Sequence, residues 1–427
     1  MHLSRRSMLG TALAPLALNF QLGGQPPKRD YDESKVRSYT LPDPLLWSNG
    51  QRVTSPAQWP KRRAEIVQMF ETNMYGRFPA RLPGTRYEVN SVAKDALGGR
   101  AERKLVTALL TRQKIDRTMD ILIYLPKERP GPVPMFLGVN FRGNQTVNAD
   151  PGIPISTKWA PYGADHRATE TTRGAQANQW PVEHILERGY GLATIYSADL
   201  SPDFNGGFDQ GVQPLFHAAG RPGRAPDEWG ALGAWAWGMS RVMDYFETDR
   251  EIDHARVAVI GHSRMGKAAL WAGGYDTRFA LTVSNCSGAG GAALSRRRFG
   301  ESVKDLNTNF PFWFCENFKT FSDNEDALPM DQHELLALCA PRPVYVGVAD
   351  QDFHADARGQ FLSAMNASPV YKLLGTDGFG AKEMPPVHQP VQTTIGFHMR
   401  AGRHDITMYD WDRYLDFADK HMRNHTQ

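Results

Sequence analysis

The stretch VAVIGHSRMGKAAL, residues 257–270, combines a short apolar run, a turn around one serine and the start of a helical pattern. A strand–turn–helix of this kind exposes a serine hydroxyl at the edge of a sheet, beside the positive end of the helix that follows. Serine hydrolases commonly carry G-x-S-x-G at such a turn. Here Met265 stands two places after Ser263, and the glycine comes one place later, at Gly266. Ser263 is therefore a candidate nucleophile, and the alternative is a serine that only caps the helix.

The segments around this turn have the pattern of an α/β protein. Short apolar runs alternate with helical segments, which predicts a mostly parallel sheet with helices on both faces. The expected strands of that sheet are 119–126, 133–141, 190–198, 257–263, 281–288 and 343–350. The expected helices are 56–76, 228–249, 265–276 and 406–422. The stretches 86–96 and 102–112 alternate like antiparallel strands. We expect an α/β-hydrolase three-layer sandwich with an N-terminal helix and strand extension.

Three long stretches rich in Gly, Pro or Asn, at about 143–180, 199–227 and 287–332, interrupt this pattern. A compact domain seldom carries loops of this length without using them. Open α/β sheets bind ligands at the ends of their strands. We interpret the three loops as walls of a substrate cleft, and the alternative is partly disordered decoration.

Composition and charge exclude several other classes of protein. The chain has 427 residues, of which 41% are hydrophobic and 22% charged, so it can form a large core. A net charge of +3 gives no basis for nucleic-acid binding. Three cysteines, Cys286, Cys315 and Cys339, allow one disulfide at most and imply no disulfide framework.

The N-terminus has the features of an export signal. The stretch SRRSMLGTALAPLAL, residues 4–18, places two arginines before an apolar run that is too short to span a bilayer. We expect residues 1–27 to be a twin-arginine export signal and leader, although a disordered tail is the alternative. Residues 28–427 are then expected to form a single catalytic domain with a periplasmic or secreted destination.

A serine nucleophile needs a base within hydrogen-bond reach and a carboxylate that orients the base. In α/β-hydrolases these residues follow in the order serine, acid, histidine. The acid should follow a late strand, and the histidine should lie in a loop close to the last helix. The candidates for the acid are Asp350, Asp352 and Asp356, and those for the base are His398 and His404. The sequence pattern leaves both choices open.

Several blocks of the chain resemble glucuronoyl esterases, carbohydrate esterase family 15. The nucleophile block GHSRMGKAALW is similar to the family signature G-x-S-R-x-G-K. Further similar blocks follow in order: FLGVNFRGNQTV, GLATIYSADLSPD, SGAGGAALSRRRFGESV, FPFWF, ADARGQFLSA and GFHMRAGRHDIT. The resemblance covers most of the mature chain. It implies cleavage of the ester between 4-O-methyl-glucuronic acid on xylan and the alcohols of lignin.

The resemblance also implies roles for single residues. Ser263 matches the nucleophile, His404 the general base, and Arg264 an arginine that helps to hold the oxyanion. The matching sugar-site residues are Lys267, which contacts uronate hydroxyls, with Glu301 and Trp313, and His354 at a place where related enzymes often carry a tryptophan. Arg264 and Lys267 would place two positive charges in the first turn of a helix, which is unfavourable with the helix dipole, so we expect both residues to have a functional role.

The chain departs from the family pattern at one catalytic position. Many members carry the acid as a glutamate after the strand that follows the nucleophile, and Cys286 stands at that place here. A thiol does not hold imidazole in the needed tautomer as a carboxylate does. Asp352 matches a second acidic position of some bacterial members, and we predict that it is the orienting acid. Asp350 and Asp356 remain alternatives.

The remaining histidines and tryptophans have simpler interpretations. We expect Cys286 to be a small buried residue, and His262 to pack or orient the turn without a catalytic role. His398 and His404 have poor spacing for a metal site, so no metal is expected. Tryptophans on the helix before the turn and on the last helix are expected in the core: Trp229, Trp235, Trp237 and Trp411.

The sequence thus predicts an exported serine esterase, expected to be a monomer, that needs no cofactor. Its partner is a glucuronoxylan or lignin–carbohydrate ester, with no nucleic acid and no membrane beyond export. Two alternatives remain. One is another carbohydrate esterase, such as a xylan acetyl esterase, and the other is a non-catalytic glucuronoxylan-binding protein left after loss of the glutamate.

Overall fold

The computed structural model describes residues 29–423, apart from residue 113 and residues 218–223. The expected export signal and leader at 1–27 lies outside the described residues. Within the described part of the chain, no helix combines the length and apolar character needed to cross a membrane.

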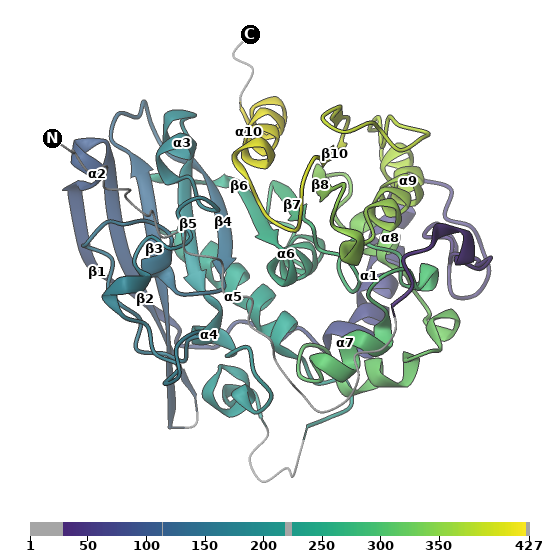
Figure 1. Ribbon diagram of the computed structural model, residues 1–427, viewed down its shortest axis with the longest axis horizontal. Coiled ribbons are helices and arrows are strands. Elements are labelled where there is room, and N and C mark those ends of the chain that lie inside the picture. The colour runs from purple at the N-terminus through teal and green to yellow at the C-terminus, as the bar shows by residue number, and fades with distance from the viewer. Residues whose placement is uncertain (1–28, 113, 218–223, 424–427) are drawn as a thin grey trace, which may run out of the picture.

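One continuous sheet forms the centre of the described chain. Its strands are β1 (Arg86–Asp95), β2 (Ala101–Arg112), β3 (Ile115–Pro126), β4 (Val133–Asn140), β5 (Gly191–Tyr196), β6 (Ile252–His262), β7 (Leu281–Asn285), β8 (Val344–Ala349), β9 (Val391–Gln392) and β10 (Ile395–Arg400). They lie in the order β1-β2-β3-β5-β4-β6-β7-β8-β10-β9 (Figure 1). Neighbours from β5 to β10 pair in parallel, whereas β1, β2 and β3 at one edge and β9 at the other pair antiparallel. The prediction of a mostly parallel sheet is confirmed, although the expected strand 119–126 belongs to the antiparallel edge.

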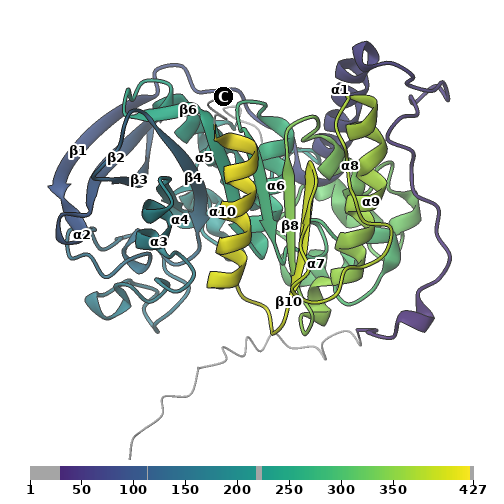
Figure 2. The same ribbon diagram turned by 90° about the horizontal axis from the view of Figure 1, so that it is seen from above.

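Helices cover both faces of this sheet, so the predicted three-layer fold is confirmed. The helices are α1 (Trp59–Phe70), α2 (Ala96–Gly99), α3 (Val182–Glu187), α4 (Ser197–Leu200), α5 (Ala231–Phe246), α6 (Arg264–Tyr275), α7 (Val303–Asn309), α8 (Gln332–Ala337), α9 (Ala357–Leu373) and α10 (Met408–Met422). α5, α6 and α9 pack on one face, and α3 and α10 pack on the other. Figure 2 shows α10 lying along its face of the sheet.

The core explains the apolar runs seen in the sequence. All residues of β8 and of α5 are buried, as expected for a strand and a helix inside a three-layer fold. Trp235 and Trp237 on α5 have no exposed surface, and Trp411 on α10 is equally buried. Trp229 is also buried, but it precedes the first residue of α5 instead of lying on the helix. The prediction that these tryptophans belong to the core is confirmed.

The segment before the last helix differs from the expectation in one respect. The sequence predicts a loop for both candidate histidines, whereas residues 395–400 form β10, which pairs in parallel with β8. His398 is therefore a fully buried strand residue, and only His404 lies in the loop that leads to α10. The two histidines are separated by the end of one strand.

Candidate active site

The turn that follows β6 gives Ser263 an unusual backbone. Ser263 lies between the end of β6 and the first residue of α6, with φ 58° and ψ −128°. A positive φ is costly for a residue with a side chain and persists only where the surrounding structure imposes it. This conformation is the strained strand-to-helix turn that presents a nucleophilic serine at the top of an α/β sheet. The side chain of Ser263 lines a cavity.

Two glycines explain how the turn tolerates a methionine where a glycine is usual. A Cβ on Gly261 would lie 2.0 Å from the carbonyl oxygen of Met265. A Cβ on Gly266 would lie 3.0 Å from the carbonyl oxygen of Gly261 and 3.1 Å from the Cβ of Ser287. At residue 265, the backbone carbonyl is what lies close to Gly261. The second glycine, Gly266, packs closely against the backbone of Gly261 in β6.

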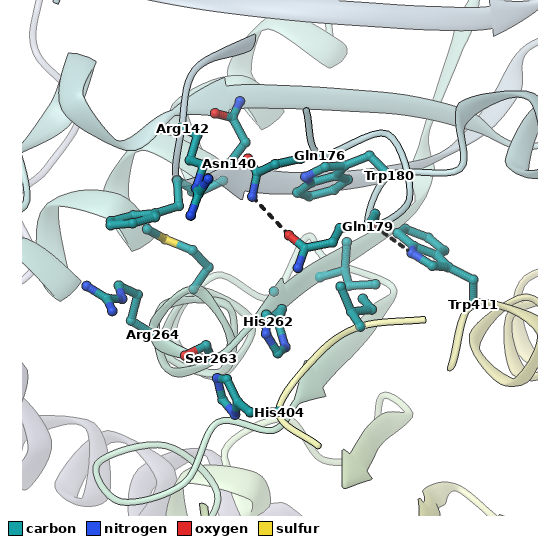
Figure 3. Close-up of a pocket in the computed structure, with 16 residues that line it drawn as sticks. Asn140, Arg142, Gln176, Gln179, Trp180, His262, Ser263, Arg264, His404 and Trp411 are labelled. Carbon is teal, nitrogen blue, oxygen red and sulfur yellow. Dashed lines mark hydrogen bonds between the residues drawn. The ribbon is translucent and has the colours of Figure 1, made fainter. Parts of the chain in front are cut away.

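His404 lies beside Ser263 (Figure 3), and the carboxylate of Asp352 holds its ring. Its Nδ1 is 2.6 Å from Asp352 Oδ2, so Nδ1–H donates to the carboxylate and Nε2 remains available as an acceptor. Burial alone would raise the pKa of Asp352, but the hydrogen bond and charge of His404 outweigh it and hold that pKa below its usual value. Among the described residues, Ser263 Oγ makes no hydrogen bond, as is common before substrate closes the geometry.

The other two candidate acids lie outside this relay. Asp350 Oδ1 accepts a hydrogen bond of 2.8 Å from the backbone N–H of Gly402. Asp356 pairs with Arg297 at 2.9 Å and caps the start of α9. The structure therefore brings Asp352, and neither alternative, to His404.

Cys286 is buried directly beside this pair. Its Sγ lies within 4.8 Å of both the Asp352 carboxylate and a ring nitrogen of His404. Burial, with the nearby carboxylates, raises the pKa of this thiol well above its usual value, so the thiol is neutral at pH 7. A metal would need the thiolate and would compete with the hydrogen bond between His404 and Asp352. The position of the usual glutamate is thus filled by a neutral group.

Arg264 has a carboxylate partner that the sequence analysis did not single out. Its guanidinium pairs with Asp203, and Trp313 Nε1 donates to the other oxygen of Asp203 at 2.7 Å. The guanidinium also lies 4.5 Å from the ring centre of Phe141 and 5.0 Å from that of Trp313. Asp203 is the last residue of the block GLATIYSADLSPD, which was the available signal for it.

Lys267, which shares the first turn of α6 with Arg264, forms a buried cluster with Glu301. Lys267 Nζ donates to the backbone oxygens of Ser287 and Ala289 and lies 3.5 Å from Glu301 Oε2. Burial lowers the pKa of Lys267. Burial would raise the pKa of Glu301, but the Lys267 ammonium and a 3.1 Å hydrogen bond with His354 lower it to about 2. Each cation in the first turn of α6 therefore has its own carboxylate, which offsets the unfavourable helix dipole.

A cavity of about 290 Å³ lies on the other side of Ser263. Its lining residues come from the end of β4, from residues 176–180, from the serine turn and from the segment that joins His404 to α10. Gln176 Nε2 donates to Gln179 Oε1 at 2.9 Å, and Trp411 Nε1 donates to the backbone oxygen of Gln179 at 2.8 Å (Figure 3). The four predicted sugar-site residues do not line this cavity. Sequence reasoning found the loop but missed Gln176 and Gln179, since polar loop residues carry no periodic signal.

The sheet order, the serine turn and the late histidine loop together define the class of this protein as an α/β-hydrolase. The serine turn follows a central parallel strand, and His404 comes from the loop before the last helix. All three long loops contribute to the surroundings of Ser263, through Gln176, Asp203 and Trp313.

Comparison with known proteins gives the family. A family profile described as "Glucuronyl esterase, fungi" matches residues 224–375. Carbohydrate esterase MZ0003, from an unknown prokaryotic organism, is 49% identical over 406 residues, which are 93% of this chain and 93% of that protein. The glucuronoyl esterase from Solibacter usitatus has a solved structure with a TM-score of 0.88 at 48% identity, covering 91% of this chain and 100% of that chain. The 4-O-methyl-glucuronoyl methylesterase of Podospora anserina is 28% identical over 317 residues, 72% of this chain and 54% of that protein. The chain therefore belongs to the glucuronoyl esterases, carbohydrate esterase family 15, and is a carboxylic ester hydrolase.

Proposed function

We propose that this protein hydrolyses the ester between 4-O-methyl-glucuronic acid on xylan and alcohols of lignin, through an acyl-enzyme on Ser263. The observation that carries the proposal is the position of the serine, which lies beside His404 with its Asp352 partner and one helical turn before Lys267 of the buried Lys267–Glu301 cluster. The first group can move a proton, and the second can recognise a hydroxylated acid. The names of the relatives point to the same substrate class.

The mechanism follows from these contacts. Ser263 Oγ attacks the ester carbonyl while His404 Nε2 takes its proton, and Asp352 stabilises the imidazolium that forms. The backbone N–H of Arg264 begins α6, where it has no acceptor within the helix, so it is available to the developing oxyanion. The Arg264 side chain adds positive charge at the same place. The alcohol leaves with the proton from His404, and water then hydrolyses the acyl-enzyme.

We assign the uronate ring to the side of Lys267, Glu301, Trp313 and His354. Lys267 and Glu301 are held by each other and by backbone oxygens, so their charges are fixed in position before substrate binds. His354 is partly exposed next to Glu301 and extends this polar surface. A pattern set before binding costs little reorganisation when sugar hydroxyls arrive.

The decisive experiment compares initial rates on benzyl glucuronate and on acetylated xylan, for the parent protein and for Ser263→Ala. The proposal expects a clear preference of the parent for the glucuronate ester, and a loss of at least about a thousandfold in the variant. Preference for acetate removal would favour a xylan acetyl esterase. A parent that binds glucuronoxylan without cleaving either ester would favour the binding protein.

We also propose that the protein is exported, because the twin arginine at Arg5 and Arg6 precedes a short apolar run. Glucuronoxylan is a polymer that an enzyme meets outside the cytoplasm. Replacing both arginines by lysine should retain the protein in the cytoplasm of the producing cell, as followed by cell fractionation.

A further inference from the structure

His262, directly before the nucleophile, has a tautomer that the buried contacts determine. Asn285 Nδ2 lies 3.1 Å from Asp410 Oδ1 and 2.6 Å from the hydroxyl of Tyr414. A carboxylate only accepts hydrogen bonds, so the amide nitrogen of Asn285 must face Asp410. The amide oxygen therefore faces His262 Nδ1 at 2.6 Å, and Nδ1 must carry the hydrogen. In the neutral ring, Nε2 is then an acceptor without a proton.

The second nitrogen of His262 is left for the cavity. Among the described residues, Nε2 has no hydrogen-bond partner, and the ring lines the cavity beside Ser263 (Figure 3). Burial, with the neighbouring His404, lowers the pKa of His262 to about 4, so the ring is neutral at pH 7. His262 therefore offers a permanent acceptor at the wall of the cavity.

His404 offers a second acceptor next to the first. Its Nδ1 is bound to Asp352, so Nε2 is its free nitrogen, and the two ring centres are 4.7 Å apart. Two adjacent acceptors are matched by a molecule with two donor hydrogens on one atom. Water is the smallest such molecule, and the second half of the proposed reaction consumes one.

We propose that His262 Nε2 positions the hydrolytic water of the deacylation step, together with His404. The inference rests on the acyl-enzyme of the proposed function. One hydrogen of the water points to His404 Nε2 and the other to His262 Nε2, which turns the oxygen lone pair toward the acyl carbon. The oxygen bonds to that carbon as His404 takes the first proton. The bond between the carbon and Ser263 Oγ then breaks, and His404 returns the proton to Oγ. The hydrogen held by His262 stays on the oxygen of the acid product.

This arrangement distinguishes water from an alcohol as the attacking molecule. An alcohol has only one hydrogen on its oxygen, which His404 takes, so it gains nothing from His262. His262 should therefore raise the rate of hydrolysis relative to alcoholysis. The ratio of acid to methyl ester formed in the presence of methanol measures this effect, and it does not depend on how fast the acyl-enzyme forms.

Two variants of the full chain separate the acceptor from the buried contact. His262→Asn places an amide N–H near Nδ1, so it can keep the bond to Asn285, but it has no acceptor at the place of Nε2. His262→Gln places its amide group near Nε2 and gives up the bond to Asn285. Each is incubated with benzyl glucuronate or 4-nitrophenyl acetate in aqueous methanol, and the acid and methyl ester are quantified by chromatography. Ser263→Ala shows the uncatalysed background.

We expect the ratio of acid to methyl ester to fall about five- to tenfold in His262→Asn, and to stay within about twofold of the parent in His262→Gln. An unchanged ratio in His262→Asn, or a fall in His262→Gln of the same size, would overturn the proposal and leave His262 a packing role. If the asparagine variant does not fold, His262→Ala, which also lacks the acceptor, gives the same comparison. A parent active on 4-nitrophenyl acetate alone would contradict the glucuronate substrate while still testing His262. A parent inactive on both esters would overturn both proposals.

Discussion

His398 and His404 are close in the sequence, and each is paired with a carboxylate, yet the two pairs behave differently. His404 and Asp352 are 2.6 Å apart at the rim of the sheet, and the His404 side chain is 41% exposed. His398 and Asp410 are 2.8 Å apart, and neither side chain has any exposed surface. The chemical groups and the distances are nearly the same in the two pairs. The difference is what else each group contacts.

The buried pair has no free position. His398 Nδ1 lies 3.2 Å from the hydroxyl of Tyr345, and Asp410 also accepts hydrogen bonds from Arg400 Nε at 2.7 Å and from the backbone of Thr407 at 2.7 Å. Arg400 in turn donates to backbone oxygens in the loop that carries His404. The buried pair therefore anchors the loop, whereas the rim pair leaves His404 Nε2 available for a proton. A histidine bound to a carboxylate is a relay only where its second nitrogen reaches the site.

The largest effect should come from removing the charge of the rim pair. Asp352→Asn should lower kcat by about ten-thousandfold, because the amide no longer holds His404 in the tautomer with a free Nε2. Steady-state kinetics on benzyl glucuronate measure this. The matched control is Asp350→Asn two residues earlier, where the carboxylate accepts from the backbone N–H of Gly402, and we expect less than a tenfold loss there. Equal losses in the two variants would refute the assignment of the acid.

Breaking the buried pair should act on folding first. Asp410→Ala leaves the buried guanidinium of Arg400 without its carboxylate, and we expect the free energy of unfolding to fall by about 3–5 kcal/mol. Urea unfolding followed by circular dichroism measures it. Asp412→Ala on the same helix serves as control, because its partner His184 is partly exposed, and a loss below about 1 kcal/mol is expected. If Asp410→Ala were as stable as the parent, the anchoring role would be wrong.

The pH dependence of the free energy of unfolding should report on the two histidines with lowered pKa values, His398 and His262. Burial lowers the pKa of His398, and burial with the nearby His404 lowers that of His262 to about 4. The unfolded chain binds protons at these residues below about pH 6.5 while the folded protein does not, so stability falls as the pH drops from 6.5 toward 4. In urea titrations, His262→Asn should lose about 2 kcal/mol less than the parent between pH 7 and pH 5. Parallel losses would show that His262 does not contribute.

The smallest effect is expected at the thiol beside the rim pair. Cys286 is neutral and buried; its thiol approaches the backbone oxygen of Asp405 at 3.9 Å and also interacts with the carboxylate of Asp352. Cys286→Ala should change kcat less than about threefold, since no charge or proton acceptor is lost, and lower stability by about 1 kcal/mol. A tenfold or greater loss of kcat without a matching loss of stability would place the thiol inside the relay.

Sequence reasoning reached the parts of this arrangement that depend on local pattern. The parallel strands appear as apolar runs, and the serine turn appears as a strand, a turn and a helix, so both could be predicted from neighbouring residues. The order serine, acid, histidine leaves few candidates, and the structure places Asp352 next to His404. The catalytic roles of Ser263, His404 and Asp352 remain predictions. The export signal, the domain boundaries and the monomeric state remain predictions.

Contacts between side chains that come together only in the fold could not be predicted from the sequence. Asp203, Asn285 and Asp410 act through partners that are distant along the chain, at Arg264, His262 and His398 respectively. A single sequence holds no signal that joins these positions. β10 was missed because a glycine, a histidine and an arginine interrupt its three apolar residues, and the buried partners of His398 and Arg400 satisfy these polar side chains inside the protein.

The crowding at Gly261 has a practical consequence for finding such enzymes in genomes. The steric demand falls on the residue two places before the serine, where any side chain would strike the carbonyl of Met265. The residue two places after the serine meets Gly261 through its backbone carbonyl, so this contact does not require a glycine there, and Met265 packs its side chain into the core. A database scan that insists on glycine there passes over this chain. A scan that requires glycine two places before the serine, and accepts the second glycine either two or three places after it, would retrieve this chain.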